Sequence, residues 1–186
     1  METKKQRDPW VTDSRLYKFR DPTGELGAAA KRGASIEELR AIAPGSLYRV
    51  EDIRGNIGLT AGIIYLLELM SGIAPSNVKL DATHAVIGVG NSNGATAAGQ
   101  TQLEAERLGM SAAWVGMDAG FPLRDGTTLI FRASFLSGVA LFDWLEWAVA
   151  WEVSTGVRVL LNRKVETVGT KPEFDLWIFE TGLRWA

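Results

Sequence analysis

Apolar and polar residues alternate with a two-residue period along the C-terminal half of the chain. In residues 127–135 every second position is apolar, and the set is Leu129, Phe131, Ala133 and Phe135. Residues 157–165 repeat the pattern with Val157, Val159, Leu161 and Val165. Successive side chains of a strand point to opposite faces, so this period predicts strands with one buried face.

Further segments extend this series of strands. We predict strands at residues 84–89, 112–117, 127–135, 140–150, 157–166 and 174–185. Asp125-Gly126 lies between two of them and predicts a hairpin turn, because both residues tolerate a positive φ. Strands that follow one another in this way favour an antiparallel sheet arrangement. We therefore predict a mainly β chain: an antiparallel β-sandwich-like domain with one or two helices and an extended N-terminal arm.

Two stretches have helical signals. Ser35 followed by Glu38 matches a capping box and predicts a short helix that ends near Ala43. Residues 59–71 form a wide apolar stripe that ends at Gly72, which predicts a helix packed against another part of the protein. Residues 100–108 are consistent with one or two further helical turns.

The first 55 residues are predicted to form an arm, and residues 56–186 a β-rich structural domain. Pro22 with Gly24, and Pro44 with Gly45, indicate turns in the arm. The arm is mixed in charge and carries four large apolar or aromatic side chains as candidate assembly contacts: Trp10, Leu16, Tyr17 and Phe19. Either these side chains fold back on the domain of their own chain, or they reach a neighbouring subunit.

Composition narrows the class of protein. Of the 186 residues, 46% are hydrophobic and 23% charged, as in ordinary globular proteins, and the net charge of −2 does not favour nucleic-acid binding. Cysteine is absent, which excludes disulfides, thiolate metal sites and cysteine nucleophiles. The charged N-terminus does not resemble a signal peptide, and Glu68 interrupts the longest apolar run, so we expect no membrane contact and synthesis in the host cytoplasm.

Tryptophan is the one unusual component. The chain has seven tryptophans, and all but Trp10 lie at or after Trp114. Large aromatic side chains are favoured in cores and in interfaces alike. Their crowding indicates that the second half of the chain carries the main packing surface, and we expect them in the core.

Two candidate sites of chemistry are weak. The run from Gly88 to Gly94 resembles a dinucleotide-binding turn, but its third glycine comes one residue late and no acidic residue follows about 20 positions on. We interpret it as a glycine-rich loop that leaves a strand. His84 is the single histidine, so it cannot form a multi-histidine metal site, and no serine nucleophile motif accompanies it.

A pair of carboxylates suggests glycosidase chemistry as an alternative. Asp143 and Glu146 lie among tryptophans, whose apolar surroundings could separate their pKa values. Three positions apart on a strand, however, the two side chains face opposite sides. We expect Glu146 to pair with a nearby base such as Arg163 or Lys164. The sequence thus predicts no catalytic residue, no cofactor and no metal site.

From Gly55 onward the chain carries an ordered set of short segments. They are Arg54-Gly55-Asn56, Val86-Ile87-Gly88-Val89-Gly90-Asn91-Ser92, Gln100-Thr101-Gln102-Leu103, Met117-Asp118-Ala119-Gly120-Phe121-Pro122, Leu129-Ile130-Phe131-Arg132-Ala133-Ser134-Phe135, Trp144-Leu145-Glu146-Trp147-Ala148, Leu161-Asn162-Arg163-Lys164-Val165 and Gly169-Thr170-Lys171. In this order they resemble small structural proteins of tailed bacteriophages, which are described as head-decoration, tail or tail-fibre components. The resemblance implies a virion protein with a β-sandwich-like body that is repeated many times on a particle.

These observations together predict a non-enzymatic structural protein of a tailed-phage virion. We expect it to decorate or stabilise the capsid exterior through subunit contacts of its N-terminal arm. The expected partners are other virion proteins, either the major capsid protein or tail proteins, with further copies of the chain, and neither nucleic acid nor membrane. The alternatives are a tail or tail-fibre component that acts in host adsorption and a carbohydrate-binding module that uses exposed tryptophans.

Overall fold

The computed structural model describes residues 10–55, 57–73, 81–96 and 99–185. The strands of this part are β1 (Trp10–Arg20), β2 (Leu47–Arg54), β3 (Ile57–Gly58), β4 (Ala85–Gly90), β5 (Ala112–Gly116), β6 (Leu123–Asp125), β7 (Thr128–Phe135), β8 (Leu141–Ser154), β9 (Val157–Leu160), β10 (Asn162–Lys171) and β11 (Asp175–Trp185). The helices are α1 (Glu25–Lys31), α2 (Ile36–Ile42), α3 (Thr60–Ser71) and α4 (Glu104–Arg107).

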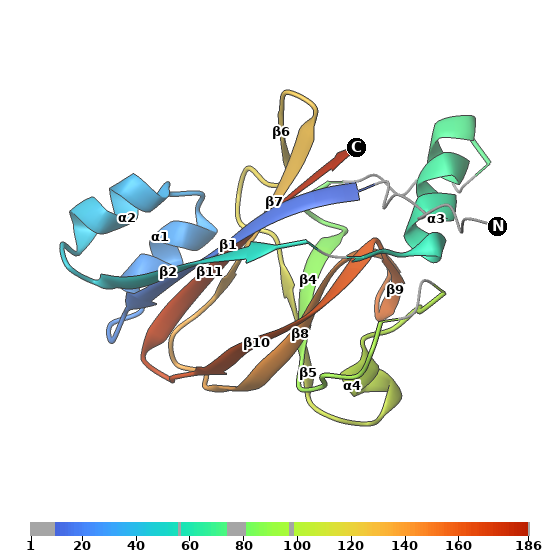
Figure 1. Cartoon of the computed structure of the whole chain (residues 1–186). Coiled ribbons are helices and arrows are strands. Elements are labelled where there is room, and N and C mark those ends of the chain that lie inside the picture. Colours follow the sequence, from blue (N-terminus) through green and yellow to red (C-terminus); the bar gives the residue numbers. More distant parts are fainter. Residues whose placement is uncertain (1–9, 56, 74–80, 97–98, 186) are drawn as a thin grey trace.

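The strands form two antiparallel sheets that stack on each other. The first sheet has the order β2-β1-β11-β7-β6, and the second has the order β3-β10-β8-β4-β5 with β9 beside β8. Helices α1 and α2 lie together at one end of the first sheet, whereas α3 lies at the opposite end of the molecule (Figure 1). The prediction of a mainly β, antiparallel sandwich-like domain is confirmed.

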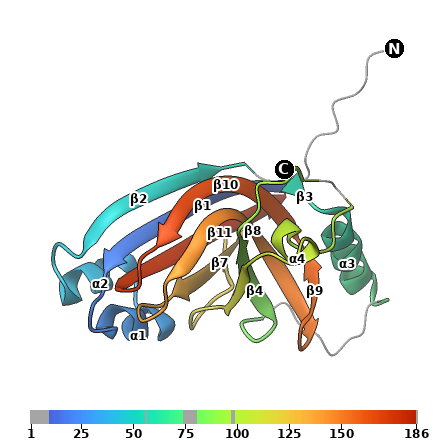
Figure 2. The same cartoon turned by 90° about the horizontal axis from the view of Figure 1, so that it is seen from below.

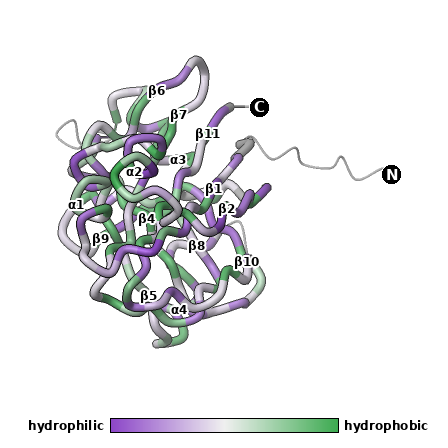
Figure 3. The backbone as a smooth tube through the Cα atoms, turned by 90° about the vertical axis from the view of Figure 1, so that its left-hand side faces the viewer, coloured by the Kyte–Doolittle hydropathy of each residue, from purple (hydrophilic) through white to green (hydrophobic). Residues whose placement is uncertain are grey.

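The main core lies between the sheets. The first sheet contributes Leu16, Ile53, Phe131, Ala133, Phe135, Trp177, Phe179 and Leu183, and the second contributes Ala85, Ile87, Val89, Trp144, Trp147, Val149 and Leu161. Strand β4 is buried along its whole length and forms a hydrophobic stretch inside the molecule (Figure 3). Ring centroids of Trp144 and Trp147 lie 5.5 and 4.8 Å from that of Phe179, in the edge-on geometry that aromatic pairs prefer.

An irregular ladder lets two tryptophans three residues apart enter the same core. The β8–β10 register shifts between Val165 and Gly169, the part of β10 that lies opposite residues 144–146 of β8. Such an irregularity breaks the strict alternation of a strand. Trp144 and Trp147 are therefore both fully buried between the sheets.

The N-terminal segment is part of the first sheet, so the predicted division into an arm (1–55) and a domain (56–186) is wrong for the described residues. Strand β1 pairs antiparallel with β11 along its full length, from Trp10 opposite Trp185 to Arg20 opposite Asp175. Its other side pairs with β2. The sequence did not predict this strand, because polar residues occupy inward-facing positions and interrupt its two-residue period of apolar side chains. Ser14 donates a hydrogen bond to the hydroxyl of Thr181 at 2.8 Å.

Lys18 is the second polar residue that hides the period of β1. Its Nζ lies 3.9 Å from the ring centroid of Trp177 and 2.9 Å from a carboxylate oxygen of Glu51. The cation is therefore buried against an aromatic face and an acid rather than exposed to solvent. From the sequence alone, a lysine at this position is expected on the surface.

The helix predictions are largely confirmed, but the structure has more than the one or two helices expected. Helix α2 carries both hydrogen bonds of the predicted capping box between Ser35 and Glu38. Helix α3 begins and ends where the apolar stripe predicted, with Gly72 at φ 71° after its last residue. The sequence did not predict helix α1, because its N-cap residue, Gly24, has no capping side chain. The carboxylate of Asp21, three residues earlier, accepts the backbone N–H groups of Leu26 and Gly27 instead.

Two further strand predictions have different outcomes. The predicted hairpin at Asp125-Gly126 joins β6 to β7, and Gly126 has a φ of 56°. The predicted strand at 157–166 is interrupted at Leu161, so that β9 and β10 pair with different parts of β8. Leu161 itself points into the main core.

Candidate functional site

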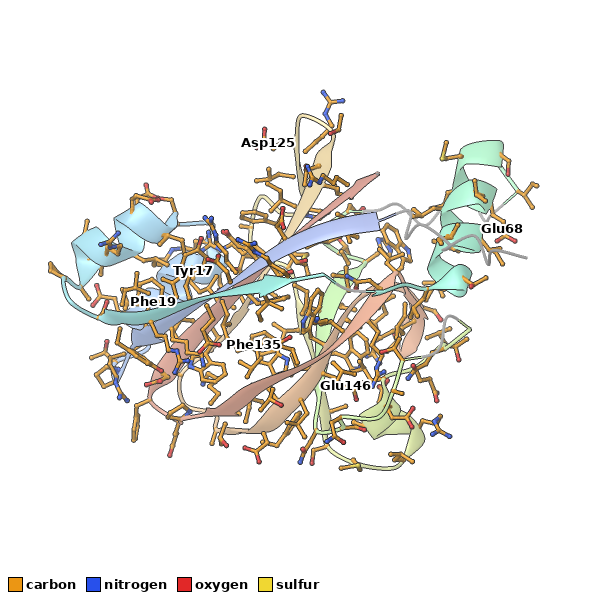
Figure 4. The ribbon with its side chains drawn as sticks, viewed as in Figure 1. Tyr17, Phe19, Glu68, Asp125, Phe135 and Glu146 are labelled. Atoms are coloured by element: carbon orange, nitrogen blue, oxygen red, sulfur yellow. The ribbon has the colours of Figure 1, made fainter. Side chains whose placement is uncertain are left out.

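Two of the four predicted assembly contacts lie in the core of their own chain. Leu16 is fully buried between the sheets, and Phe19 is fully buried under α1 and α2. Tyr17 is half-buried on the same side of β1 as Phe19 (Figure 4). The side chain of Trp10 lies outside the described residues. Leu16 and Phe19 are thus not available to a partner, which corrects the sequence-based assignment of these two residues.

Four exposed large apolar side chains lie on α3 or just after it. We call the set Ile64, Leu67, Met70 and Ile73 the α3 patch; its members are between 49% and 85% exposed. Ile64, Leu67 and Met70 recur every three residues, each about 60° around the helix axis from the one before, so together they cover one side of α3, and Ile73 follows just beyond its end. A contiguous exposed apolar surface on a folded chain is typical of an interaction site.

The opposite side of α3 is fixed to the body. Tyr65 packs on Trp151, with ring centroids 6.1 Å apart. Gly62 lies so close to the β9–β10 junction that a Cβ atom there would be 2.6 Å from the carbonyl oxygen of Leu160. The helix was predicted to pack against another part of the protein. It does so through this one side, and the apolar α3 patch remains exposed.

A buried ion pair joins the second sheet to α4. The Nε of Arg163 lies 2.5 Å from a carboxylate oxygen of Glu146, and both side chains are fully buried. The same carboxylate accepts the backbone N–H groups of Glu104 at 3.0 Å and Ala105 at 2.7 Å, at the start of α4. The prediction that Glu146 pairs with Arg163 or Lys164 is confirmed, with Arg163 as the partner; Glu146 is labelled in Figure 4.

The other end of the Arg163 guanidinium holds the glycine-rich loop. It donates to the hydroxyl of Thr96 at 2.7 Å and to the carbonyl oxygen of Gly94 at 3.0 Å. A Cβ atom on Gly90 would lie 2.5 Å from a carboxylate oxygen of Glu146. Gly90 is therefore required by close packing against the ion pair. A phosphate approaching Gly90 would face the carboxylate of Glu146, which disfavours the dinucleotide interpretation.

A second buried carboxylate, which the sequence did not predict, attaches helices α1 and α2 to the first sheet. Asp118 is fully buried and lies 3.0 Å from the Nζ of Lys31 and 3.2 Å from the Nε of Arg132. It also accepts hydrogen bonds from the backbone N–H and the hydroxyl of Ser134, at 3.1 and 2.6 Å. Arg132 donates onward to the carbonyl oxygen of Ala34, between α1 and α2, at 2.7 Å. The centre therefore ties both helices to β7.

The open half of the first sheet carries a groove in two parts. They measure about 480 and 570 Å³ and share Arg15 and Glu180 as lining residues. Burial raises the pKa of Glu180, while Arg132 and Arg15 oppose that rise. Burial also raises the pKa of Tyr17, and the negative charge of Glu180 adds to that rise. The groove thus holds both signs of charge and favours neither an anion nor a cation.

The described residues contain neither a metal-binding cluster nor a membrane-spanning helix. No three His, Asp or Glu side chains of residues 10–55, 57–73, 81–96 and 99–185 are grouped so that they could hold a metal ion. None of the helices in these ranges is long and apolar enough to cross a bilayer. His84 lies 2.8 Å from a carboxylate oxygen of Asp81 and stacks on Trp151.

Tryptophan burial bears on the carbohydrate alternative. Trp144, Trp147 and Trp177 are at most 2% exposed and belong to the main core. Trp114 is half-buried, and its indole N–H donates to Glu106 at 2.8 Å. A sugar-binding platform needs exposed aromatic rings, which these four side chains do not offer. Asp143, the other carboxylate that was considered for glycosidase chemistry, is exposed and accepts a hydrogen bond from the hydroxyl of Thr170.

Compared with protein-family models, with curated proteins and with solved structures, the chain shows no significant match. The fold and the site therefore define it only as an antiparallel β-sandwich with an exposed apolar helix face and internally paired charges.

Removal of one partner of the buried ion pair should destabilise the fold strongly. We expect Glu146→Ala to lower the free energy of unfolding by about 3–5 kcal/mol, because Arg163 then stays buried without a counter-charge. The double variant Glu146→Met/Arg163→Met should be more stable than Glu146→Ala. Urea unfolding measures both. The exposed neighbour Asp143→Ala is the control, with an expected change of about 0.5 kcal/mol or less. Equal stability of Glu146→Ala and Asp143→Ala would contradict the structural role of the pair.

A buried lysine at the end of β10 should make stability depend on pH. Lys171 is 1% exposed, and its Nζ donates to the carbonyl oxygens of Val139 and Pro172. Burial lowers its pKa from 10.5 to about 8, although Asp175 and Asp21 oppose the shift. Between these two pKa values the unfolded chain binds more protons, so stability rises with pH.

We therefore expect the wild-type chain to gain stability relative to Lys171→Met as the pH rises from about 8 to about 10.5. Below about pH 8 the difference between the two proteins should be constant. Thermal or urea unfolding across this range measures it. If the stabilities of the two proteins changed in parallel across this pH range, burial would not lower the pKa of Lys171 in the folded chain.

Proposed function

We propose that the chain is a non-enzymatic structural protein of a tailed-phage virion that binds the capsid exterior in many copies. The ordered segments from Gly55 onward support the virion assignment through their resemblance to such proteins. The observation that carries an assembly role is the α3 patch, because four large apolar side chains face solvent on or just after a helix that the body holds firmly from its other side. Contact with a partner would remove this surface from water.

The buried charges support a structural rather than a catalytic role. Glu146 and Asp118 are each fully buried, and each is saturated by a cation and by backbone N–H or hydroxyl donors. A general acid or base must reach a substrate with its reacting atoms. These carboxylates instead join segments that are distant in sequence.

The proposed contact differs from the one expected from sequence. Leu16 and Phe19 serve the core, so the anchor to the major capsid protein is assigned to the α3 patch rather than to an N-terminal arm. A tail or tail-fibre component is the alternative location, and its partner would be a tail protein. The carbohydrate-binding alternative is disfavoured by the burial of Trp144, Trp147 and Trp177.

Binding to particles tests this proposal. Capsids assembled without the protein are mixed with the purified, gold-labelled chain, and bound label is counted after sedimentation and located by electron microscopy. Wild-type chain should cover the capsid exterior. Leu67→Lys should bind at least tenfold more weakly, because a charge in an apolar contact must lose its hydration. Leu108→Lys is the matched control, since Leu108 is 53% exposed and Leu67 is 54% exposed.

Each result is decisive. Failure of the wild-type chain to bind any particle would overturn the virion assignment. Label confined to the tail would replace the capsid location with the tail alternative. Equal binding of Leu67→Lys and Leu108→Lys would show that the α3 patch is not the contact.

A further inference from the structure

The first sheet ends in an uncovered edge strand. Strand β2 pairs with β1 on one side, and no described strand pairs with its other side. It lies along the outer margin of the sheet, without a helix or strand beyond it (Figure 2). Its residues 47–54 contain neither proline nor lysine, but they carry four charged side chains, Arg49, Glu51, Asp52 and Arg54, and their register with β1 shifts between Leu47 and Arg49. Charged side chains block an edge unless the incoming strand carries their counter-charges. The other edge of this sheet, β6, is only 3 residues long.

Edge strands bind extended partners by continuing the sheet. The unpaired N–H and C=O groups supply affinity that is independent of sequence, while cross-strand side chains select the partner and the register. When two copies of one edge pair about a two-fold axis, the contact is self-complementary and closes into a dimer. The axis must be perpendicular to the sheet, so that equivalent faces of the two copies coincide.

The charges of β2 suit such a self-pairing when Val50 lies at the two-fold axis. If Val50 lies opposite Val50 of the partner subunit, then Arg49 lies opposite Glu51 of the partner subunit, and the reciprocal pair forms across the axis. Val50 is 47% exposed and would gain an apolar contact with its own copy. Arg49 is 64% exposed and lies 2.6 Å from Glu51 of its own strand, so the four charges would form one alternating cluster.

Neighbouring registers lack this complementarity. Shifting the axis to Glu51 places that acid opposite its own copy, and shifting it to Asp52 or Arg49 does the same for those residues. Like charges that face each other directly across a sheet are unfavourable. Among these four positions only the axis at Val50 places opposite charges together. An axis at Ile53 would also do so, with Asp52 opposite Arg54 of the partner subunit, but it would pair only residues 52–54 of β2, whereas the axis at Val50 pairs residues 47–53.

We propose that β2 is a homodimer contact, in which the free edges of two copies pair antiparallel with Val50 at the two-fold axis. Two five-stranded sheets then become one continuous sheet of ten strands. The occupant of the edge is a second copy of this chain, because the charge pattern is complementary to itself. This inference does not rest on the virion proposal, since it concerns the purified chain alone.

A single cysteine at the axis tests the register directly. The chain has no cysteine, so Val50→Cys carries the only thiol. Opposite Cα atoms in an antiparallel pair lie about 4.5–5.5 Å apart, within the range that a disulfide spans. Oxidation by copper–phenanthroline in air should therefore yield a cross-linked dimer. Asp52→Cys is the control, because its two copies would be four positions, or about 13 Å, apart along the strands.

Charge reversal tests the pairing by a second route. In sedimentation equilibrium up to about 1 mM, the wild-type chain should dimerise, and Arg49→Glu should raise the dimer dissociation constant at least tenfold. Arg15→Glu should leave it within about twofold of wild type. Arg15 is a matched control, because it is 63% exposed and also pairs with an acid of β2, but it lies on β1.

A mixture of two variants should restore the contact. Arg49→Glu places two acids on each edge and Glu51→Lys places two bases, so the mixed dimer should form at least tenfold more tightly than either variant alone. Glu51 also contacts the buried Lys18, so circular dichroism must first show that Glu51→Lys folds. The cysteine experiment does not involve Glu51 and decides the question if this variant does not fold.

Three results would overturn the inference. They are a wild-type chain that stays monomeric throughout the concentration series, cross-linking of Asp52→Cys at the same rate as Val50→Cys, and unchanged dimerisation of Arg49→Glu. None of them depends on particles. A chain that dimerises through β2 yet binds no capsid would leave this inference standing and overturn the proposed function alone.

Discussion

The ladder between β1 and β11 is the constraint on which the rest of the structure depends. It joins the first described strand to the last, over 11 residues, in the middle of the first sheet. Leu16 and Trp177 reach the main core from this pair of strands, while Phe19 and Ile178 form the second core under α1 and α2. Without β1 the first sheet would be split between β2 and β11, and both cores would lose members.

This placement of β1 also determines which surfaces remain free. Because β1 is an interior strand, β2 becomes the edge, and the segment after it crosses to the second sheet through β3 and leads into α3. The uncovered edge and the α3 patch are therefore consequences of one chain path. A protein that assembles through two different surfaces can make a dimer with one and bind a larger partner with the other.

Buried charge is the second organising feature. The ion pair of Glu146 with Arg163 and the centre around Asp118 hold α4 and α1 against the sheets through charge-assisted hydrogen bonds. Burial of such pairs adds little net stability compared with well-packed apolar residues, but loss of one partner is costly. We infer that their role here is to fix how the helical segments are attached, which apolar contacts alone would specify less sharply.

Local signals in the sequence predicted local structure well. Ser35 with Glu38, Asp125 with Gly126, and Gly72 act within a few residues, so each could be interpreted without knowledge of the fold. The pairing of Glu146 with a base was predictable because an acid among tryptophans needs a counter-charge. Strand β1 was missed because Ser14 and Lys18 occupy inward positions, where their partners Thr181 and Trp177 are far away in sequence.

The Asp118 centre was missed for the same physical reason. Its ion-pair and hydrogen-bond partners are Lys31, Arg132 and Ser134. They come from segments that only folding brings together, and no local sequence motif marks any of them. The α3 patch was foreseen only in part. An all-round apolar helix indicates burial, but its sequence does not say which side the same chain covers.

Hydrogen exchange of the backbone amides tests most directly whether the N-terminal segment belongs to the sheet. Strand β1 is hydrogen-bonded on both sides, so its amides between Asp13 and Arg20 should open only with the global unfolding of the domain. The account predicts that these amides are protected as strongly as those of β11. Rapid exchange in β1 alongside strong protection of β8 and β11 would show a detachable arm and contradict the account.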